Sequence, residues 1–425
     1  MLKEAPYWWE TAAPLPKLIT RPLPDHADVV IIGSGYTGLS AARILAMRGV
    51  DVVVLEKETF GWGASSRNGG QVLTGLKWGP AALVEKVGLA SAKEMYAASL
   101  AAIDYLAELI EEENIDCEYV RCGHIEAAWK AKHFDAYRSE QELLEREFNH
   151  RVQLLDRAEQ QRELGTTRYH GLLIDEASAA VHPTKYVRGL AISASALGAL
   201  LLENTPAVAL KRQGTKYSVK TPQGTIETEQ VLIATNGYTD AALANFQRRL
   251  MPIGSFIIAT EPLSPEIAQR LLPQRRVVFD SKHYLYYFRL SADNRLLFGG
   301  RAEYKPPTPE NTRRSAQVLQ RGMVKIFPEL QDVQVDYVWS GQLAATLDFF
   351  PRVGQLDGIY YALAYAGHGV AMATYLGSQL ANIMCGAPGK NPFRDLPFKP
   401  IPLYNGRPWF MPLGALWYQV LDLLK

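Results

Sequence analysis

The chain has few cysteines for its length, and this scarcity limits the chemistry that it can carry. Its 425 residues include only Cys117, Cys122 and Cys385. Three thiols cannot form a disulfide framework, and no histidine pair accompanies them at the spacing of a zinc site. Each is therefore interpreted as a small buried apolar side chain, and no metal site is predicted. The scarcity of cysteine also indicates the reducing cytoplasm.

The sequence also lacks an export signal and a strong charge bias. Glu4 and Pro6 stand where a signal peptide would need an apolar core, so no export is expected. The formal net charge is +1, and no run of basic residues is interleaved with aromatic ones. Nucleic acid is therefore not expected as a partner. Catalytic patterns of the Ser-His-Asp, HExxH or paired-carboxylate kind are also missing, so little acid–base machinery is expected.

What the sequence does contain is a glycine-rich turn between two apolar runs. Val29–Ile32 leads into Gly33-Ser34-Gly35-Tyr36-Thr37-Gly38, a helical pattern follows, and a second run, Val52–Leu55, ends at Glu56 and Lys57. This order is that of a dinucleotide-binding βαβ unit. Gly33 allows the tight turn, Gly35 lets the backbone approach a pyrophosphate at the helix N-terminus, and Gly38 lets helix and strand pack closely. A carboxylate at Glu56 suits ribose hydroxyls and repels a 2′-phosphate, so FAD or NAD is favoured over NADP.

Glycine-rich strand ends recur at 28–71, 231–237 and 341–370, and two insertions separate them. The sequence therefore predicts an α/β fold in which a Rossmann-like domain is assembled from discontinuous segments, with an inserted substrate domain built on a mostly antiparallel sheet. Helices are expected at 80–114, 132–164, 183–197 and 309–327, and another is opened by Gly367-His368-Gly369-Val370 and runs to about Cys385. A hairpin is expected at 216–234. The expected boundaries are 26–79, 166–244 and 336–392 for the nucleotide-binding domain, 80–165 and 245–335 for the substrate domain, 1–25 for an N-terminal arm and 393–425 for a C-terminal tail.

Five segments together resemble one family. GSGYTGLSAA, GASSRNGGQ, YYFRLSADNRLLFGG, WSGQLAATLDFFPRVG and AGHGVA are similar to the glycine/D-amino-acid oxidase family of flavoproteins. The similarity runs from Tyr7 nearly to the C-terminus. Within the family, the chain is most similar to γ-glutamylputrescine oxidoreductases. The resemblance implies an enzyme that uses FAD.

The resemblance also assigns residues to each part of the cofactor. It places Gly33, Gly35, Gly38 and Glu56 at the ADP half and Val208 at the adenine. Reduced flavin gathers negative charge near its pyrimidine ring, and Gly367, His368, Gly369 and Val370 would present N–H groups and a helix N-terminus to it. Ser65, Ser66, Arg67, Asn68, Gly69 and Gly70 would run along the ribityl chain and ring. The remaining residues expected to bind FAD are Ser34, Tyr36, Thr37, Lys57, Gln71, Thr235, Asn236, Gly237, Gly341 and Gly354.

Departures from the family pattern refine these expectations. Some relatives tether FAD through a cysteine in the stretch that corresponds to 339–354, or through a histidine in the loop that reads SSRNGG here, and both residues are missing. Non-covalent FAD is therefore expected. Amino-acid-oxidising relatives place a lysine shortly after the GHG motif, where this chain has Val370, Ala371 and Met372. An amine is therefore favoured over a substrate with a carboxylate beside the reacting carbon.

Three residues are candidates for contact with the substrate. Strand alternation puts Tyr287 and Arg289 on one face and Tyr286 and Phe288 on the other, and by position the Tyr287 face matches the one turned to the flavin in relatives. Arg289 could bind a remote carboxylate, such as that of a γ-glutamyl group, or pair with Asp293. Tyr287 could equally be a core aromatic, and His368 a structural neighbour of the flavin instead of a proton carrier.

The expected reaction is the oxidation of an amine C–N bond by hydride transfer to flavin N5, after which the imine hydrolyses to an aldehyde. A γ-glutamylputrescine-like polyamine derivative is the expected small-molecule substrate, and O2 or a quinone the acceptor. One alternative is an amino-acid dehydrogenase or oxidase of the same fold that donates electrons to quinone. The other is a tRNA-modifying or non-catalytic flavoprotein, which the neutral charge disfavours.

The C-terminal tail bears on location. Apolar residues recur at helical spacing within 408–425, and Pro412 interrupts the segment. It is too short for a membrane span. The tail therefore either packs on the protein or makes a peripheral contact with the inner face of the cell membrane.

Overall fold

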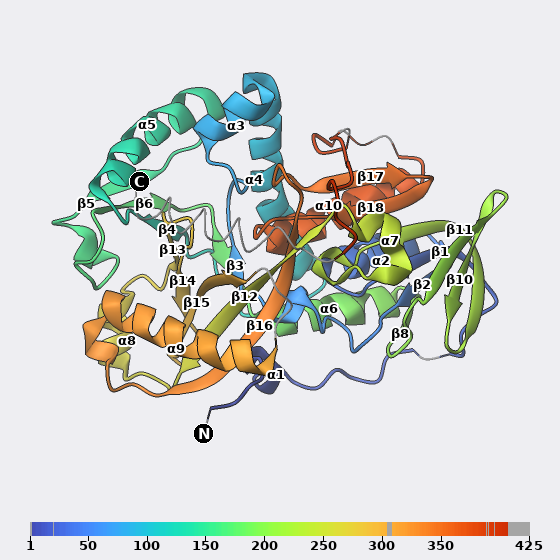
Figure 1. Ribbon diagram of the computed structural model, residues 1–425, viewed down its shortest axis with the longest axis horizontal. Helices are drawn as coiled ribbons and strands as arrows, with labels where there is room; N and C mark the ends of the chain where they lie inside the picture. Colours follow the sequence, from blue (N-terminus) through green and yellow to red (C-terminus); the bar gives the residue numbers. More distant parts are fainter. Residues whose placement is uncertain are drawn as a thin grey trace.

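Two eight-stranded sheets, each drawn from several parts of the chain, form the framework of the protein (Figure 1). The computed structural model describes residues 2–19, 21–303, 308–387, 389, 391–394 and 396–406, with the side chains of 301–303 excepted. Within this part, short helices α1 (Tyr7–Glu10) and α7 (Ala244–Gln247) and a ribbon of β3 (Gln71–Val72) and β7 (Ala179–Ala180) complete the elements named below.

The first sheet is the nucleotide-binding sheet that the glycine motif predicts. Its strands run in the order β17 (Arg352–Leu356), β18 (Ile359–Leu363), β11 (Gly224–Ile233), β1 (His26–Ile32), β2 (Val52–Leu55) and β8 (Leu200–Leu202). β18, β11, β1, β2 and β8 are parallel to their neighbours, while β17 is antiparallel to β18. β1 and β2 contain the continuous apolar runs Val29–Ile32 and Val52–Leu55, because both faces of these central strands are covered. β9 (Ala209–Gln213) and β10 (Lys216–Thr221) extend β11 as antiparallel strands, which confirms the predicted hairpin.

Four helices pack together on one face of this sheet. They are α2 (Tyr36–Met47), α6 (Pro183–Ala196), α10 (Gly369–Met384) and α4 (Leu89–Glu112), and their apolar faces share one core with β1 and β2. α10 crosses α2 so closely that a Cβ at Gly377 would lie 2.4 Å from the Thr37 carbonyl oxygen. α4 is separated from α3 (Pro80–Val87) by Gly88, whose φ of +78° ends the single helix expected at 80–114.

The second sheet is mostly antiparallel, as expected for the substrate domain. Its order is β16 (Val335–Ala345), β12 (Met251–Thr260), β15 (Leu296–Glu303), β14 (Tyr287–Leu290), β13 (Val277–Asp280), β4 (His124–Ala127), β6 (Gly171–Asp175) and β5 (Gln153–Asp156). Only the β13–β4 pair is parallel. α8 (Pro265–Leu271) and α9 (Pro309–Ile326) contribute to the core on one face of this sheet. On its opposite face, α5 (Ala131–Phe148) contacts β5 and β6 (Figure 1).

The structure differs from the expected boundaries in three places. β6 and β16 fall in segments assigned to the nucleotide-binding domain but pair in the second sheet, and α4 falls in the substrate segment but packs on the first. The helix expected over 132–164 ends at Phe148, because Asn149 takes a left-handed conformation with φ +50°, and β5 follows.

No helix in the described ranges is both long and apolar enough to cross a bilayer. The amphipathic segment 408–425 lies outside the described residues.

Candidate functional site

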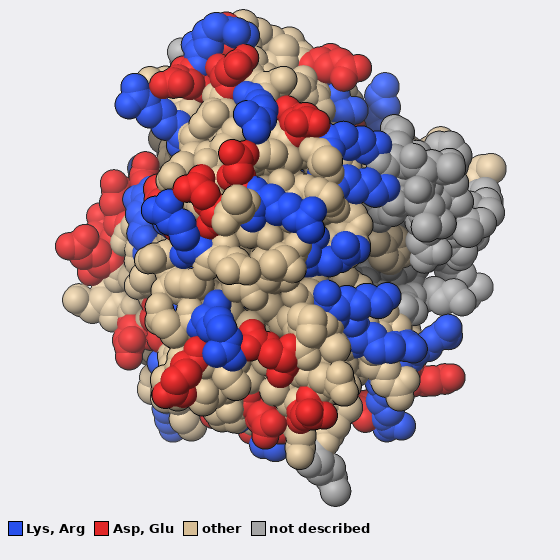
Figure 2. All heavy atoms as spheres, turned by 90° about the vertical axis from the view of Figure 1, so that its left-hand side faces the viewer, with Lys and Arg blue, Asp and Glu red and all other residues tan. Residues whose placement is uncertain are grey.

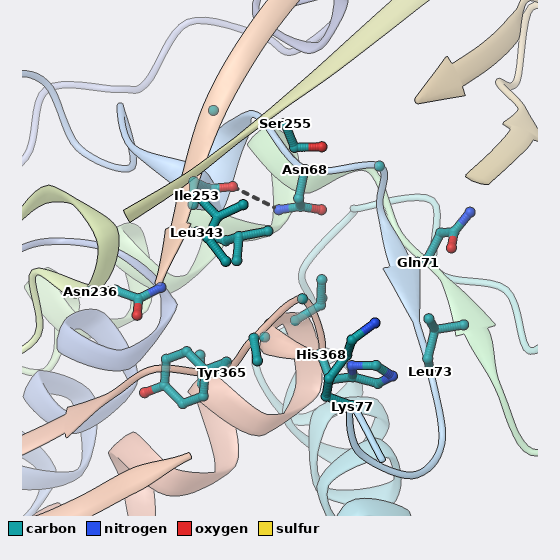
Figure 3. A pocket seen from close by; sticks show the side chains of 18 of the residues that line it. Asn68, Gln71, Leu73, Lys77, Asn236, Ile253, Ser255, Leu343, Tyr365 and His368 are labelled. Carbon is teal, nitrogen blue, oxygen red and sulfur yellow. Dashed lines mark hydrogen bonds between the residues drawn. The ribbon is translucent and has the colours of Figure 1, made fainter. Parts of the chain in front are cut away.

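A cavity of about 1350 Å³ lies where the carboxyl ends of the first sheet's strands meet the second sheet. Ile32, Leu55 and Ala234 line it at the ends of β1, β2 and β11. In Figure 3, Ile253 and Leu343 of the second sheet lie across the open space from Lys77 and His368. Ligands of open α/β sheets bind at the carboxyl ends of the strands, so this cavity is the candidate active site.

The glycine turn has the geometry that its sequence predicts. Gly33 has φ +106°, and a Cβ there would lie 2.9 Å from the Ala234 carbonyl oxygen. A Cβ at Gly38 would lie 1.9 Å from the Gly33 carbonyl oxygen, so only glycine permits this contact between helix and turn. A Cβ at Gly35 would meet Ser65 Oγ at 2.9 Å, the same oxygen that accepts a hydrogen bond from Tyr36 N. Because Gly33 and Gly35 carry no side chain, the turn leaves room for a phosphate to approach the N-terminus of α2.

Glu56 is held in place by the same turn. Its Oε2 accepts hydrogen bonds from Ser34 N at 3.0 Å and Ser34 Oγ at 2.6 Å, and its Oε1 accepts one from Glu58 N at 3.0 Å. The carboxylate lines the cavity and keeps further acceptor capacity. It is placed to receive hydroxyl donors, as a ribose would supply.

The loop after β2 is organised by Asn68. Its Nδ2 donates to the carbonyl oxygens of Ala64 and Ser65 and to the Tyr36 hydroxyl, and its Oδ1 accepts from Gly70 N at 2.8 Å. Arg67 lies between the rings of Trp9 and Trp62, at 4.6 and 4.3 Å from their centroids. These contacts fix an irregular segment whose small residues leave room for a planar ligand.

The N-terminus of α10 faces the cavity through the predicted Gly367–Val370 segment. His368 Nδ1 is buried and has no hydrogen-bond partner in the described structure. Burial, together with the positive charge of Lys77, lowers the pKa of His368 to about 3, so the ring is neutral near pH 7. An unpartnered buried nitrogen is costly, and a ligand with a matching donor or acceptor would satisfy it.

Tyr287 lines the cavity, as alternation along β14 predicts, while Phe288 points into the opposite core. Its hydroxyl lies 2.9 Å from Ser255 Oγ, and burial raises its pKa to about 12, so the hydroxyl keeps its proton. The ring edge would lie 3.2 Å from a Cβ at Gly69, so Tyr287 stands directly against the loop expected to hold the flavin.

Arg289 shares that face but does not line the cavity. It is buried, and its guanidinium donates to the carbonyl oxygens of Gly70 at 3.0 Å, Val181 at 2.9 Å and Leu290 at 3.3 Å. Asp293, the alternative partner, pairs with Arg295 instead. The structure therefore gives Arg289 a packing role between the flavin loop and β7–α6, in place of both readings drawn from the sequence.

Most other predicted cofactor residues line the cavity, and six do not. Gly38, Ser66, Gly70, Gly237 and Gly354 are absent from the lining. Val208 is 45% exposed and donates its N–H to the Lys220 carbonyl oxygen, while its neighbours Pro206 and Ala207 line the cavity. The residues that do line it are Gly33, Ser34, Gly35, Tyr36, Thr37, Glu56, Lys57, Ser65, Arg67, Asn68, Gly69, Gln71, Thr235, Asn236, Gly341, Gly367, His368, Gly369 and Val370.

Several charged residues of the lining escaped the sequence reasoning, among them Lys77, Glu126 and Glu140. Lys77 follows the flavin loop by a few positions and points into the cavity beside His368 (Figure 3). Glu126 interrupts an apolar strand, and Glu140 lies three residues after buried Tyr137 and four before buried Leu144. A charge at a core-facing position of a strand or helix was the available signal.

Comparison with known proteins agrees with this geometry. The family model described as FAD dependent oxidoreductase (DAO) matches residues 28–383. The chain belongs to this family.

Among curated members, the γ-glutamylputrescine oxidoreductase of Escherichia coli (strain K12) is 35% identical over 93% of each chain. The probable oxidoreductase OrdL of Haemophilus influenzae is also 35% identical, over 85% of this chain and 84% of its own. The solved glycine oxidase of Geobacillus kaustophilus has the same fold, with a TM-score of 0.76 at 21% identity over 89% of this chain and 99% of its own.

As a DAO family member, the chain is an FAD-dependent oxidoreductase, and its cavity suits that cofactor. The open glycine turn, the Glu56 carboxylate and the unpartnered His368 nitrogen provide sites for phosphate, ribose and flavin polar groups. Cys117, Cys122 and Cys385 do not line the cavity, and burial raises the pKa of the Cys117 thiol to about 12. No cysteine is therefore positioned to form a thioether with the flavin.

Proposed function

We propose that the enzyme oxidises a γ-glutamylputrescine-like amine at its terminal C–N bond. The 35% identity to the Escherichia coli γ-glutamylputrescine oxidoreductase, over 93% of both chains, is the observation that carries this proposal. The carboxyl groups of Glu126 and Glu140 in the cavity lining support it, because they suit a substrate with a second ammonium group better than one whose charges are all negative.

The reaction requires a neutral amine, whose lone pair supports departure of the hydride from the adjacent carbon. FAD, when bound, supplies the acceptor for that hydride at N5. The imine then takes up water and releases an aldehyde and ammonia. The α10 N-terminus at Gly369 and Val370 stabilises negative charge beside it, and neutral His368 adds a hydrogen bond without adding a charge. Tyr287 closes the cavity wall with a protonated hydroxyl.

Anaerobic titration of the yellow holoenzyme tests the proposal. Bleaching of the oxidised flavin band would be followed with γ-glutamylputrescine, putrescine, D- and L-amino acids and N-methyl amino acids. γ-Glutamylputrescine is expected to bleach the band fastest and to yield an aldehyde. Faster bleaching by an amino acid, or no bleaching by any amine, would contradict the assignment. Reoxidation by O2 compared with a soluble quinone analogue then identifies the acceptor.

A second candidate is an amino-acid dehydrogenase of the same fold, and Lys77 is the observation that favours it. The missing lysine after Gly369 argued against a carboxylate near the reacting carbon, yet Lys77 places an ammonium beside His368 (Figure 3). It forms no ion pair with any described residue. Under this alternative, Lys77→Met abolishes flavin reduction by the preferred amino acid. Under the amine assignment, Lys77→Met retains reduction by γ-glutamylputrescine.

A further inference from the structure

The cavity continues from the flavin-binding loop onto a face of the second sheet that α5 covers. Its lining there includes Glu126, Glu140, Leu144, Val152 and Leu173. None of these residues belongs to the segments expected to bind FAD, so this part of the cavity is available to the substrate.

Glu126 is directed into the cavity by the sheet. It lies in the middle of β4, paired with Phe279 of β13 and Leu173 of β6, which both line the cavity. Its neighbours Ile125 and Ala127 point to the opposite face and are fully buried in the core beneath α9. The register therefore fixes the carboxylate on the cavity side.

Glu140 faces it from α5. Tyr137, Glu140 and Leu144 lie on one side of this helix, and Tyr137 packs with Phe134 against Leu173 of the sheet. The Glu140 carboxylate oxygens would lie 3.7 and 3.8 Å from a Cβ at Gly79, two residues after Lys77. Helix and loop thus bring the second carboxylate to the same chamber.

Neither carboxylate forms an ion pair with a residue that the structure describes. Burial raises the pKa of Glu126 to about 7 and outweighs the opposing effects of the Tyr137 hydroxyl and the Lys77 charge. Burial, followed by repulsion from Glu126, raises the pKa of Glu140 to about 8. The ionised form of an unpaired carboxyl group in a cavity is unfavourable, and a ligand that supplies a positive charge stabilises it. Lys77, also unpaired, points into the same cavity beside His368.

The acidic pair is a feature of the interior. On the outer face formed around α5 and β5, acidic and basic side chains are interspersed over most of the surface (Figure 2). The attraction for a cation therefore comes from the chamber and not from this face of the protein.

We propose that Glu126 and Glu140 form a subsite that binds the ammonium group of the substrate remote from the reacting amine. This inference rests on the proposed function and names what selects its substrate. The positive charge of Lys77 beside His368 disfavours an ammonium there, so a substrate with two amines is oriented with its charged end at the carboxylates. A cation beside the reacting amine also favours its neutral, reactive form.

The test compares substrates with and without an ammonium group at the end remote from the reacting amine. Glu126→Gln and Glu140→Gln keep the size of the side chain, and Glu142→Gln, an exposed change on the same helix, is the matched control. γ-Glutamylputrescine and putrescine carry a remote ammonium, whereas N-acetylputrescine does not. Each Gln variant is expected to raise KM for the two cationic substrates at least tenfold and to change KM for N-acetylputrescine less than twofold. The limiting rate of flavin reduction stays within twofold of the unmodified enzyme.

Thermal stability provides a readout that a structural role would not give. Because each substitution removes an unpaired, partly buried acid, Tm is expected to stay constant or to rise while selectivity falls. Equal losses on all three substrates, or no loss on any, would overturn the inference. A lowered Tm with equal losses would identify the pair as structural.

A binding measurement separates this inference from the proposed function. γ-Glutamylethylamide carries the same α-ammonium but lacks the reacting amine, so its affinity for the holoenzyme can be measured by calorimetry without turnover. Binding at least tenfold weaker to Glu126→Gln, with Glu142→Gln unchanged, supports the subsite even if no amine reduces the flavin. Equal binding to all three proteins contradicts the subsite even if γ-glutamylputrescine is the substrate.

Discussion

Arg289 shows, at the scale of a single residue, how a buried guanidinium joins distant segments. Its three hydrogen bonds satisfy carbonyl oxygens of the flavin loop, β7–α6 and its own strand, and Trp8 lies 5.8 Å from it. Arg289→Ala would remove all three hydrogen bonds, and the Gly70 carbonyl oxygen would keep only the one that it accepts from Val181 N. We expect a loss of about 3 kcal/mol or more in the free energy of unfolding, measured by urea denaturation.

The same variant separates packing from recognition. Arg314→Ala, an exposed change on α9, is the control and should alter stability by less than about 0.5 kcal/mol. With the FAD content matched, Arg289→Ala is expected to affect charged and uncharged amines equally. A selective loss on γ-glutamylated substrate with unchanged stability would restore a direct role in recognition.

Glu56 carries the second prediction at this scale. Glu56→Ala removes the acceptor that the turn positions, and with it charge-assisted hydrogen bonds to the ribose. FAD affinity should fall roughly ten- to hundredfold, equivalent to about 1.5–3 kcal/mol, in a fluorescence titration of the apoprotein. Glu229→Ala, at an exposed position of the same sheet, should leave it unchanged. An unaltered dissociation constant for Glu56→Ala would place the ribose elsewhere.

The contrast among residues has a physical basis. The glycine turn and the RNGG loop were predictable because their geometry is local and each glycine answers a steric demand within a short segment. The alternation of side chains along β14 predicted correctly that Tyr287 faces the cavity. It did not predict that Arg289, on the same face, is buried beyond the cavity, because alternation does not say where along a strand a cavity ends. Lys77, Glu126 and Glu140 come together only through the pairing of distant elements, so no sequence window contains their arrangement.

At the scale of elements, the N-terminal arm holds the flavin loop from outside. Trp8 Nε1 donates to the Asn68 carbonyl oxygen and Trp9 Nε1 to Ser66 Oγ, both at 2.9 Å, while Trp9 stacks on Arg67. Neither tryptophan lines the cavity. Trp9→Ala should therefore weaken FAD binding several-fold through the loop alone. The measurement is the rate at which FAD fluorescence rises as the cofactor dissociates on dilution, and this rate should increase. Trp9→Phe retains the stacking, so its rate of FAD release should lie between those of the unmodified enzyme and Trp9→Ala. Equal release rates in all three proteins would show that the arm does not position the loop.

Elements with strong local signals matched their predicted ranges. α6 begins at Pro183 with His182 Nδ1 accepting from Lys185 N, and α9 begins at Pro309 after a capping box at Thr308. The predicted helix extended to residue 164 because the charged composition continues past Asn149. The helix ends earlier because one residue, Asn149, adopts a left-handed conformation. Composition extends a predicted helix, but capping ends it.

At the scale of the molecule, the chain passes repeatedly between two sheets. The division into a nucleotide-binding sheet and a mostly antiparallel sheet followed from the glycine-rich strand ends, and the structure contains both. The sequence did not predict that β6 and β16 belong to the second sheet. These strands are adjacent in sequence to nucleotide-binding elements, and long-range pairing determines their partners. The cavity lies between the two sheets, so its walls combine both architectures.

That arrangement makes FAD a ligand of the whole fold and leads to the last prediction. The cysteines lie away from the cavity, and the loop that reads SSRNGG has no histidine, so we expect FAD to be held without a covalent bond. Acid precipitation should release all yellow colour into the supernatant as intact FAD, and colour retained in the pellet would contradict this. Because FAD would contact segments of both sheets, removing it should also lower Tm. Free FAD at about 100 times its dissociation constant should restore about 2.7 kcal/mol of stability, and Tm should rise with FAD concentration. A Tm independent of FAD would mean that the two sheets are held together without the cofactor.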